Sequence, residues 1–268
     1  MGIINVTPDS FSQDGCLKNS RDFVKKAIAL ASRHVREGAD ILDVGGESSR
    51  PGARRISVQE EIDRVIPVIH QLSKKFSLPI SIDTYKASVA HEALNAGAMI
   101  VNNIRGTDGD EKLLKVVKEL DAAIILMHIR GTPRTMQKNI YYKDLIGEVV
   151  FSLQKSLEKC LEIGIKSDKI IIDPGIGFGK SADHNLEILN RLDELKLLHR
   201  PLMVGTSRKS FIGEVLNTDV NQRLYGTLAT VCASILKGAH IVRVHDVKPT
   251  KEVALMADAI LHQSSAPE

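Results

Sequence analysis

The segment that decides the fold reads Gly38-Ala39-Asp40-Ile41-Leu42-Asp43-Val44. Gly38 follows an amphipathic stretch that begins at Ser20, and a glycine in that place supplies the left-handed residue that ends a helix. Residues 40–44 are mostly aliphatic and show no alternation with polar residues, which is typical of a strand buried on both faces of a parallel sheet. The segment therefore predicts the end of a helix followed at once by a buried parallel strand.

The same unit recurs along the whole chain. Short apolar runs that end in a polar or glycine-rich turn occupy residues 2–6, 40–44, 79–82, 99–101, 122–127, 169–172, 201–204 and 240–244. Amphipathic stretches lie between these runs, and three more of them end in a glycine, at Gly97, Gly164 and Gly238. The stretch at 57–66 opens with Ser57 and Glu60 at the spacing of a capping box, which predicts a helix start.

Eight buried strands, each followed by a helix, predict an α/β fold of the (β/α)8 TIM-barrel type. The competing layout is a doubly wound open sheet, and the number of strands favours the barrel. No linker rich in Pro or Ser interrupts the series, so we expect one domain over residues 1–268. The glycines of residues 175–179 follow GxGxG spacing rather than GxGxxG, and we discount a dinucleotide site.

Composition excludes several classes of function. The chain has 36 Lys and Arg against 33 Asp and Glu, and this net charge of +3 is too small to favour nucleic acid or an anionic membrane as a partner. Trp is absent, which also argues against stacking on single strands. No apolar stretch reaches the length of about 18 residues that a membrane span requires. Cys16, Cys160 and Cys232 are odd in number and far apart, which indicates a reducing, cytoplasmic location.

Polar residues follow every predicted strand, at the end of a barrel where catalytic groups are found. They are Asn5, Asp43, Asp83, Asn102, His128, Asp173, Ser207 with Lys209, and Arg243 with His245. A single aspartate ahead of a helix is also the usual N-cap, so Asp83 or Asp173 alone would be weak evidence. The presence of such groups on all eight strands predicts a shared site. We expect the other helical histidines on surfaces without a role: His34, His70, His91, His184, His199 and His262.

One set of these groups suits a flat heterocycle. Asp83, Asn102 and Asp173 combine two carboxylates, which accept hydrogen bonds in pairs, with an amide that both donates and accepts. Such a set fits a ring with an amidine-like edge, for example a 2-amino-4-oxo-pyrimidine, better than it fits a phosphate.

The second set calls for an anion. Arg50, Lys209, Arg243 and His245 are cationic or can become so. Asn5 adds a neutral oxygen that can join phosphate oxygens and water around Mg²⁺, an ion that is rarely held by protein groups alone. The alternatives are an internal salt bridge for Arg243 and a satisfied buried imidazole for His245.

Eight motifs lie at these strand ends, in order along the whole chain. They are NVTPDSFS at 5–12, DVGGESSRPG at 43–52, SIDT at 81–84, NNIR at 102–105, LMH at 126–128, DPGIGFGK at 173–180, SRKS at 207–210 and RVHDV at 243–247. Together they resemble the motifs of the dihydropteroate synthase family. The resemblance implies an enzyme of folate synthesis that joins 4-aminobenzoate to (7,8-dihydropterin-6-yl)methyl diphosphate and releases pyrophosphate and 7,8-dihydropteroate.

The resemblance also implies roles for individual residues. The family's pterin pocket corresponds to Asp83, Asn102, Asp173 and Lys209, with Ile104 and Met127 as apolar walls. Its diphosphate and Mg²⁺ site corresponds to Asn5 as the metal ligand and to Ser49, Arg243, Val244 and His245. Its aminobenzoate contacts correspond to Ser49, Arg50, Pro51, Phe178, Ser207 and Lys209. The groups expected to be catalytic are Asp83, Asp173, Lys209, Arg243 and His245. The family is a homodimer and the target of sulfonamides, which mimic aminobenzoate.

Two alternatives come from other classes. A methyltetrahydrofolate:corrinoid methyltransferase would share the Asp/Asn/Asp pocket but would have no need for the cationic groups of SRKS and RVHDV. A non-catalytic barrel that serves as a binding module would tolerate the loss of these groups, yet all of them are retained.

Two segments predict an order of binding. Residues 7–16 and 48–55 combine Pro, Gly, Ser and charge, and neither carries an apolar stripe. Loops of that composition are expected to move until a ligand holds them. The holding groups would be Asn5 on one side and Ser49 with Arg50 on the other, and both need the diphosphate. We therefore expect the pterin diphosphate to bind first and aminobenzoate second, with Mg²⁺-pyrophosphate able to replace the first substrate as organiser.

Overall fold

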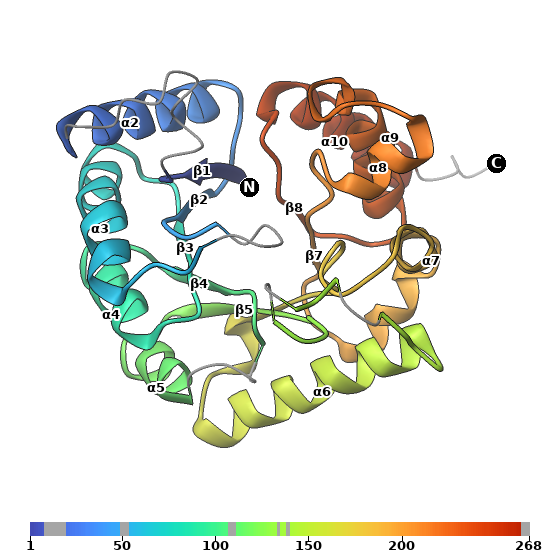
Figure 1. Cartoon of the computed structure of the whole chain (residues 1–268), viewed down its shortest axis with the longest axis horizontal. Coiled ribbons are helices and arrows are strands. Elements are labelled where there is room, and N and C mark those ends of the chain that lie inside the picture. The colour runs from blue at the N-terminus through green and yellow to red at the C-terminus, as the bar shows by residue number, and fades with distance from the viewer. Residues whose placement is uncertain (8–19, 49–53, 107–110, 133–134, 138–139, 264–268) are drawn as a thin grey trace.

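The computed structural model of the protein describes residues 1–7, 20–48, 54–106, 111–132, 135–137 and 140–263. This part of the chain contains eight parallel strands: β1 (Gly2–Asn5), β2 (Leu42–Gly45), β3 (Ile80–Asp83), β4 (Ile100–Asn103), β5 (Ala123–Met127), β6 (Ile170–Asp173), β7 (Met203–Val204) and β8 (Ile241–Val242). The first six form one sheet in chain order, and β7 pairs with β8. Parallel bridges between Ile172 and Leu202, and between Gly2 and Val244, close the circle. The predicted (β/α)8 barrel is confirmed (Figure 1).

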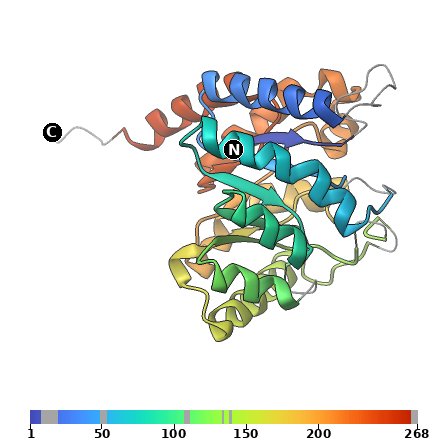
Figure 2. The ribbon, with the colours of Figure 1, turned by 90° about the vertical axis from the view of Figure 1, so that its left-hand side faces the viewer.

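Helices cover the outside of the barrel. Those in the described residues are α2 (Ser20–Arg36), α3 (Val58–Lys75), α4 (Ala87–Asn95), α5 (Glu111–Glu119), α6 (Leu145–Ile163), α7 (Ala182–Asn190), α8 (Ser210–Leu216), α9 (Leu224–Leu236) and α10 (Val247–Leu261). Short 3-10 turns lie at η1 (Ser167–Lys169), η2 (Leu192–Leu198) and η3 (Val220–Gln222). Neighbouring helices pack side by side, and Figure 2 shows α2 to α5 stacked in chain order down one side. None of the described helices is both long and apolar enough to cross a bilayer.

The continuous apolar character of the strands follows from burial on both faces. Val101 and Ile124 belong to the large core that packs against the helices. Successive strand residues point to opposite faces, so their neighbours Ile100 and Ile125 face the interior of the barrel. There they form a small separate cluster with Met1 and Met203. This apolar plug fills the floor of the barrel and leaves the other end for polar groups.

Helix ends confirm some of the sequence predictions in detail and correct others. Gly38, Gly97, Gly164 and Gly238 all have the left-handed backbone that a helix stop requires. Ser57 is the N-cap of α3 and accepts a hydrogen bond from the Glu60 backbone N–H at 3.0 Å.

The prediction of a reciprocal capping box was wrong for its second half, because the Glu60 side chain instead accepts a hydrogen bond from Arg64 at 2.5 Å. The surface position expected for His34 was also wrong. That side chain is 1% exposed, and its Nε2 lies 3.0 Å from the carbonyl oxygen of Ile3.

Candidate active site

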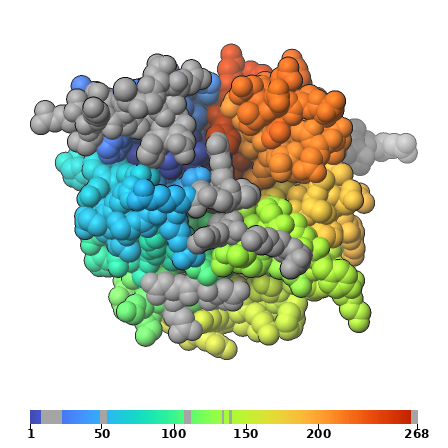
Figure 3. Space-filling view, viewed as in Figure 1, coloured from blue at the N-terminus to red at the C-terminus, as the bar shows by residue number. Residues whose placement is uncertain are grey.

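The carboxyl ends of the strands all lie at one end of the barrel, which we call the mouth. The arrows in Figure 2 point toward it, and Figure 3 looks directly onto it. The parallel register places Gly45 beside Asp83 and Asp83 beside Asn102. It also places Met127 at the end of β5 beside Asp173 at the end of β6. The three groups predicted to recognise a heterocycle therefore come from β3, β4 and β6 and open to the same end.

An ion-pair network links three strands across the barrel. Arg243 follows β8, and its Nη2 lies 2.6 Å from Asp43 Oδ2 on β2 and 2.8 Å from Asp83 Oδ2 on β3. Its Nε donates a second hydrogen bond to Asp43 Oδ2 at 2.7 Å. Asp43 is completely buried. The internal salt bridge that we considered for Arg243 is therefore present, and its main partner is Asp43, which the sequence places at the shared site without a specific task.

Buried acceptors without partners point to a missing donor at the mouth. Asn102 is 2% exposed, and its Oδ1 has no hydrogen-bond partner among the described residues. Asp43 Oδ1 is in the same situation in this part of the chain. Because an unsatisfied buried polar atom costs free energy, such atoms are expected to meet a ligand or water. Asn102 thus has the geometry of a ligand-binding group.

Burial shifts the titration of the two carboxylates. It raises the pKa of Asp83 to about 7, against the opposing effect of the Arg243 guanidinium. It also raises the pKa of Asp173, where the Lys209 ammonium and a hydrogen bond from the Gly175 N–H oppose the shift. Groups with shifted pKa values that share a cleft are candidates for function.

Lys209 and Phe178 lie together on the other side of the mouth. Lys209 caps the start of α8, and its Nζ lies 4.8 Å from the centre of the Phe178 ring. The same ammonium donates a hydrogen bond to the carbonyl oxygen of Ile176. Burial lowers the pKa of Lys209 to about 8, while the Asp173 carboxylate opposes this shift. The structure thus brings the predicted aminobenzoate contacts from the β6 and β7 loops side by side.

Ser207 and His245 form a second pair. The Ser207 hydroxyl lies 2.9 Å from His245 Nδ1 and accepts a hydrogen bond from the His245 backbone N–H at 3.2 Å. Val244 lies between Arg243 and His245, which are both predicted to bind an anion. Its side chain is buried in the core that packs against the helices. Its backbone carbonyl accepts a hydrogen bond from Ile3, and its N–H donates to Met1, so Val244 contributes to closing the barrel.

The predicted metal ligand and apolar walls also lie near the mouth. Asn5 ends β1 and pairs in register with Gly45. A Cβ added to Gly45 would lie 3.8 Å from Asn5 Oδ1 and 3.7 Å from Asp83 Oδ2, so both side chains reach the same place beside Gly45. Met127 and Ile104 are buried at the ends of β5 and β4. The described residues contain no cluster of three His, Cys, Asp or Glu able to hold a metal. One amide oxygen fits a metal that takes its other ligands from substrate phosphate and water, as Mg²⁺ does.

Three of the predicted substrate contacts, Ser49, Arg50 and Pro51, lie outside the described residues. The segment that contains them is flanked by an ion-pair network that sequence reasoning missed. Lys86 Nζ lies 2.5 Å from Glu47 Oε2 and donates a hydrogen bond to the Ile56 carbonyl at 2.9 Å. It also pairs with the buried Glu61 at 2.6 Å. One lysine thus links residues on both sides of the segment 48–55.

A second missed group is the pair of Lys180 and His128. Both side chains are buried, and Lys180 Nζ lies 2.8 Å from His128 Nδ1. The DPGIGFGK and LMH motifs contained these two residues, but their spacing gave no sign that they meet.

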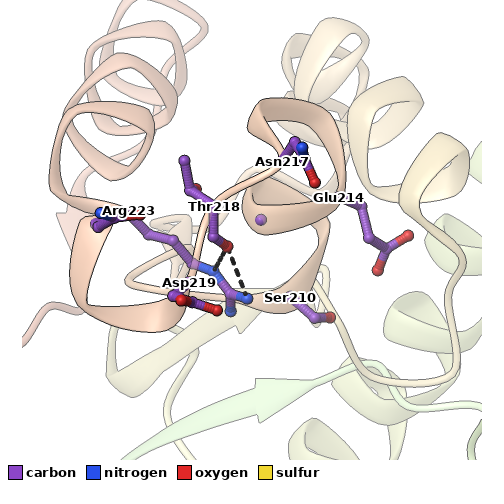
Figure 4. Close-up of a pocket in the computed structure, with 8 residues that line it drawn as sticks. Ser210, Glu214, Asn217, Thr218, Asp219 and Arg223 are labelled. Atoms are coloured by element: carbon purple, nitrogen blue, oxygen red, sulfur yellow. Dashed lines mark hydrogen bonds between the residues drawn. The ribbon is translucent and has the colours of Figure 1, made fainter.

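An open pocket of about 370 Å³ lies away from these groups, around the end of α8 (Figure 4). It is lined by Ser210, Gly213, Glu214, Asn217, Thr218, Asp219, Gln222 and Arg223. Arg223 donates hydrogen bonds to backbone carbonyls within this region, at 3.4 Å to Thr218 and 3.1 Å to Arg208. None of the predicted site residues lines this pocket. Those that the structure describes lie at the mouth of the barrel instead.

The chain is similar in sequence and in structure to known proteins. The sequence profile of the pterin binding enzymes matches residues 1–245. The dihydropteroate synthase of Synechocystis sp. is 49% identical over 263 residues, which is 97% of this chain and 89% of that protein. The crystal structure of Yersinia pestis dihydropteroate synthase with a sulfonamide drug complex is 42% identical with a TM-score of 0.92, over 97% of this chain and 93% of that one. Xanthomonas albilineans dihydropteroate synthase with 4-aminobenzoic acid is 38% identical with a TM-score of 0.90, over 100% and 93% of the two chains.

Proposed function

The chain belongs to the family of dihydropteroate synthases within the pterin-binding enzymes, and on that premise we propose how the mouth of its barrel carries out the family's reaction. The enzyme is a transferase of folate synthesis. It condenses 4-aminobenzoate with (7,8-dihydropterin-6-yl)methyl diphosphate to give 7,8-dihydropteroate and pyrophosphate. Sulfonamides compete for the aminobenzoate position. The observation that carries the proposed site is the buried Asn102 amide oxygen, which has no partner among the residues that the structure describes, between two carboxylates with shifted pKa values.

The pterin ring binds against Asp83, Asn102 and Asp173. The 2-amino-4-oxo-pyrimidine edge carries N–H donors that two carboxylates can accept, and the Asn102 amide supplies the remaining polar contact. Met127 and Ile104, which are buried beside them, supply apolar surface for the faces of the ring. Binding of the donors favours the ionised form of Asp83, because a hydrogen bond to a carboxylate lowers its pKa.

The diphosphate binds on the side of Arg243, His245 and Asn5. Arg243 uses Nε and Nη2 for Asp43 and Asp83, and its Nη1 would donate to phosphate oxygens. Asn5 would hold Mg²⁺ together with water and the diphosphate. When bound, this ion neutralises negative charge on the leaving group.

The chemical step is a dissociative substitution. The bond between the methylene carbon and the diphosphate oxygen breaks, and its electron pair leaves with the pyrophosphate. The electron-rich dihydropterin spreads the positive charge, and the largely buried carboxylates of Asp83 and Asp173 stabilise it. The neutral amine nitrogen of aminobenzoate then bonds to the methylene carbon and loses a proton to solvent. An aniline is nucleophilic in its neutral form, so no strong general base is required.

Aminobenzoate binds where Phe178 and Lys209 lie together, with Ser207 behind them and with Ser49, Arg50 and Pro51 from the second loop. Lys209 serves both substrates, since it neighbours Asp173 as well as Phe178. The direct test is the release of pyrophosphate when the purified protein, Mg²⁺ and both substrates are mixed. Release that requires all of them, with formation of dihydropteroate, supports the proposal, and its absence contradicts it.

We also propose that the protein is a cytoplasmic homodimer. The neighbouring helices α9 and α10 expose large apolar side chains, among them Tyr225, Leu255 and Met256, and a second copy of the chain would cover them. Cys160 and Cys232 are free, as expected in a reducing compartment. Light scattering should show a dimer that Leu255→Glu converts to a monomer. Phe151→Glu, at an equally exposed apolar residue on α6, is the control.

A further inference from the structure

Lys180 is a buried lysine whose side-chain nitrogen has three hydrogen-bond partners. Its Nζ donates hydrogen bonds at 3.0 Å to the carbonyl oxygens of Gly175 and Phe178, and it lies 2.8 Å from His128 Nδ1. An ammonium has three N–H donors, and the three acceptors use all of them. Only 2% of the residue is exposed. A lysine that gives up hydration so completely must be held by a defined surrounding structure.

His128 is the fixed side of this arrangement. It directly follows β5, and its backbone N–H donates to the carbonyl of Asp173 at 2.9 Å, which continues the ladder between β5 and β6. Burial lowers the pKa of the imidazole to about 2, so the ring is neutral and Nδ1 can act as an acceptor. Lys180 therefore binds to a part of the molecule that the barrel itself holds in place.

The loop that Lys180 holds, residues 174–179, has an unusual backbone. Gly175, Gly177 and Gly179 all have positive φ angles, at 68°, 81° and 67°. A Cβ on Gly175 would lie 1.9 Å from the carbonyl oxygen of His128. The backbone of the loop at Gly175 thus lies in direct contact with the end of β5. Two of its carbonyl groups turn toward the same point, and the Lys180 ammonium is the donor that satisfies them both.

This loop supplies the groups proposed to receive aminobenzoate. Phe178 belongs to it, and the Ile176 carbonyl in its middle accepts the hydrogen bond from Lys209. Asn185 of α7 fixes the intervening residue, with its Oδ1 accepting from the Gly177 N–H at 2.6 Å. The positions of Phe178 and Lys209 therefore depend on the conformation that Lys180 stabilises.

We propose that Lys180 is a positioning residue: its ammonium joins the loop 174–179 to His128 and so fixes Phe178 and Lys209 for aminobenzoate. This inference rests on the proposed function of the mouth. Asp173 is less dependent on Lys180, because it is the last residue of β6 and pairs in register with Met127 of β5. Loss of Lys180 should therefore affect aminobenzoate more than the pterin substrate.

The variant Lys180→Met keeps an unbranched chain of similar length but removes the donors. We expect the KM for aminobenzoate to rise about tenfold or more, as loss of charge-assisted hydrogen bonds to the loop predicts, while the KM for the pterin diphosphate stays within about threefold. Calorimetric titration of a sulfonamide should show the same loss of affinity. Lys115→Met, at an exposed lysine of α5, is the matched control.

A second pair of variants keeps the test decisive if Lys180→Met fails to fold. His128→Leu removes the acceptor, whereas the Oδ1 of His128→Asn can occupy the place of Nδ1. The KM for aminobenzoate should rise in the leucine variant and recover in the asparagine variant. Unchanged aminobenzoate KM in folded Lys180→Met or His128→Leu, or an equal rise for both substrates, overturns the inference. Inactive wild-type protein would instead overturn the proposed function.

Discussion

Arg243 joins the two substrate regions at the level of single atoms. The same Nη2 touches the deep carboxylate of Asp43 and the carboxylate of Asp83 that faces the pterin. Removing one partner of a buried ion pair leaves the other charge uncompensated, which is costly. The Arg243 guanidinium is therefore held in one orientation, and its contacts with Asp43 set that orientation. This arrangement makes Asp43 a residue that should matter for turnover without touching either substrate.

The variant Asp43→Asn tests that expectation. The amide keeps the size of the side chain but removes the charge that orients Arg243. We expect kcat to fall by about tenfold to a hundredfold, which corresponds to one hydrogen bond between charged groups. Asp40→Asn is the control, because Asp40 pairs with Lys251 at the surface, at 3.0 Å. Wild-type kcat in folded Asp43→Asn would show that Asp83 alone positions the guanidinium.

Asp83 itself is expected to be essential for the chemical step. Asp83→Asn removes negative charge that stabilises the methylene cation, an effect worth roughly 2.7–4 kcal/mol by analogy with other positioned groups. Turnover should therefore fall on the order of a hundredfold or more, with the circular dichroism spectrum unchanged. A variant that turns over at the wild-type rate would remove Asp83 from the mechanism.

The raised pKa of Asp83 also predicts a dependence on pH. The carboxyl is protonated below its pKa of about 7 and becomes an acceptor above it. Affinity for a pterin that lacks the diphosphate should therefore increase by about tenfold between pH 6 and pH 8, following the ionised fraction. Calorimetric titrations across this range provide the measurement. The asparagine variant should show a flat profile, and an equally steep profile there would assign the effect to another group.

At the scale of elements, the sequence predicts the strands well because their surroundings are uniform. Every predicted apolar run overlaps a strand, and three strands (β2, β3 and β6) end one residue beyond the predicted run, as β3 does by including Asp83. The closure of the barrel is harder to predict from the sequence. β7 and β8 have two residues each, and single bridges join them to β6 and β1. Pairing of this kind depends on residues that are far apart in the chain, and the periodicity of apolar residues within one segment does not reveal it.

The site shows the same division. The sequence predicts that Asp83, Asn102 and Asp173 lie at one end of the barrel, because parallel strands bring their carboxyl ends together, and the structure places them there. The contacts of Asp43 with Arg243, and of Lys180 with His128, were not found, because they depend on side-chain directions inside the barrel. His34 was placed on a surface because helix periodicity does not show that β1 covers it.

The N-cap of α3 permits a prediction at this scale. Ser57→Ala removes the acceptor for the Glu60 N–H and should lower the free energy of unfolding by about 1 kcal/mol. Urea denaturation is the measurement, with an unchanged m-value expected. Ser57→Asp retains a capping oxygen and should be close to wild type. Equal stability of the alanine and aspartate variants would show that the cap contributes nothing.

At the scale of the whole molecule, the two substrates should bind in order. We expect groups from the first and second loops to need the diphosphate before the aminobenzoate position is complete, and residues 8–19 and 49–53 of these loops lie outside the described part of the chain. Aminobenzoate should therefore bind measurably only when the pterin diphosphate or Mg²⁺-pyrophosphate is present. Titrating aminobenzoate with and without Mg²⁺-pyrophosphate separates this scheme from a preformed pocket. Equal affinity in the two titrations would contradict ordered binding.

The ion pairs of Arg243 have a consequence for how the protein is made. They join residues 200 and 160 positions apart in the chain, so the anion-binding guanidinium meets its carboxylates only after β8 has been synthesised. Contacts between residues so far apart in the chain form late, because the entropy cost of closing such a long loop is offset only when the rest of the barrel is in place. A nascent chain that has already built β1 to β6 carries Asp43 and Asp83 but not their partner Arg243. Substrate binding thus becomes possible only after β8 has entered the barrel.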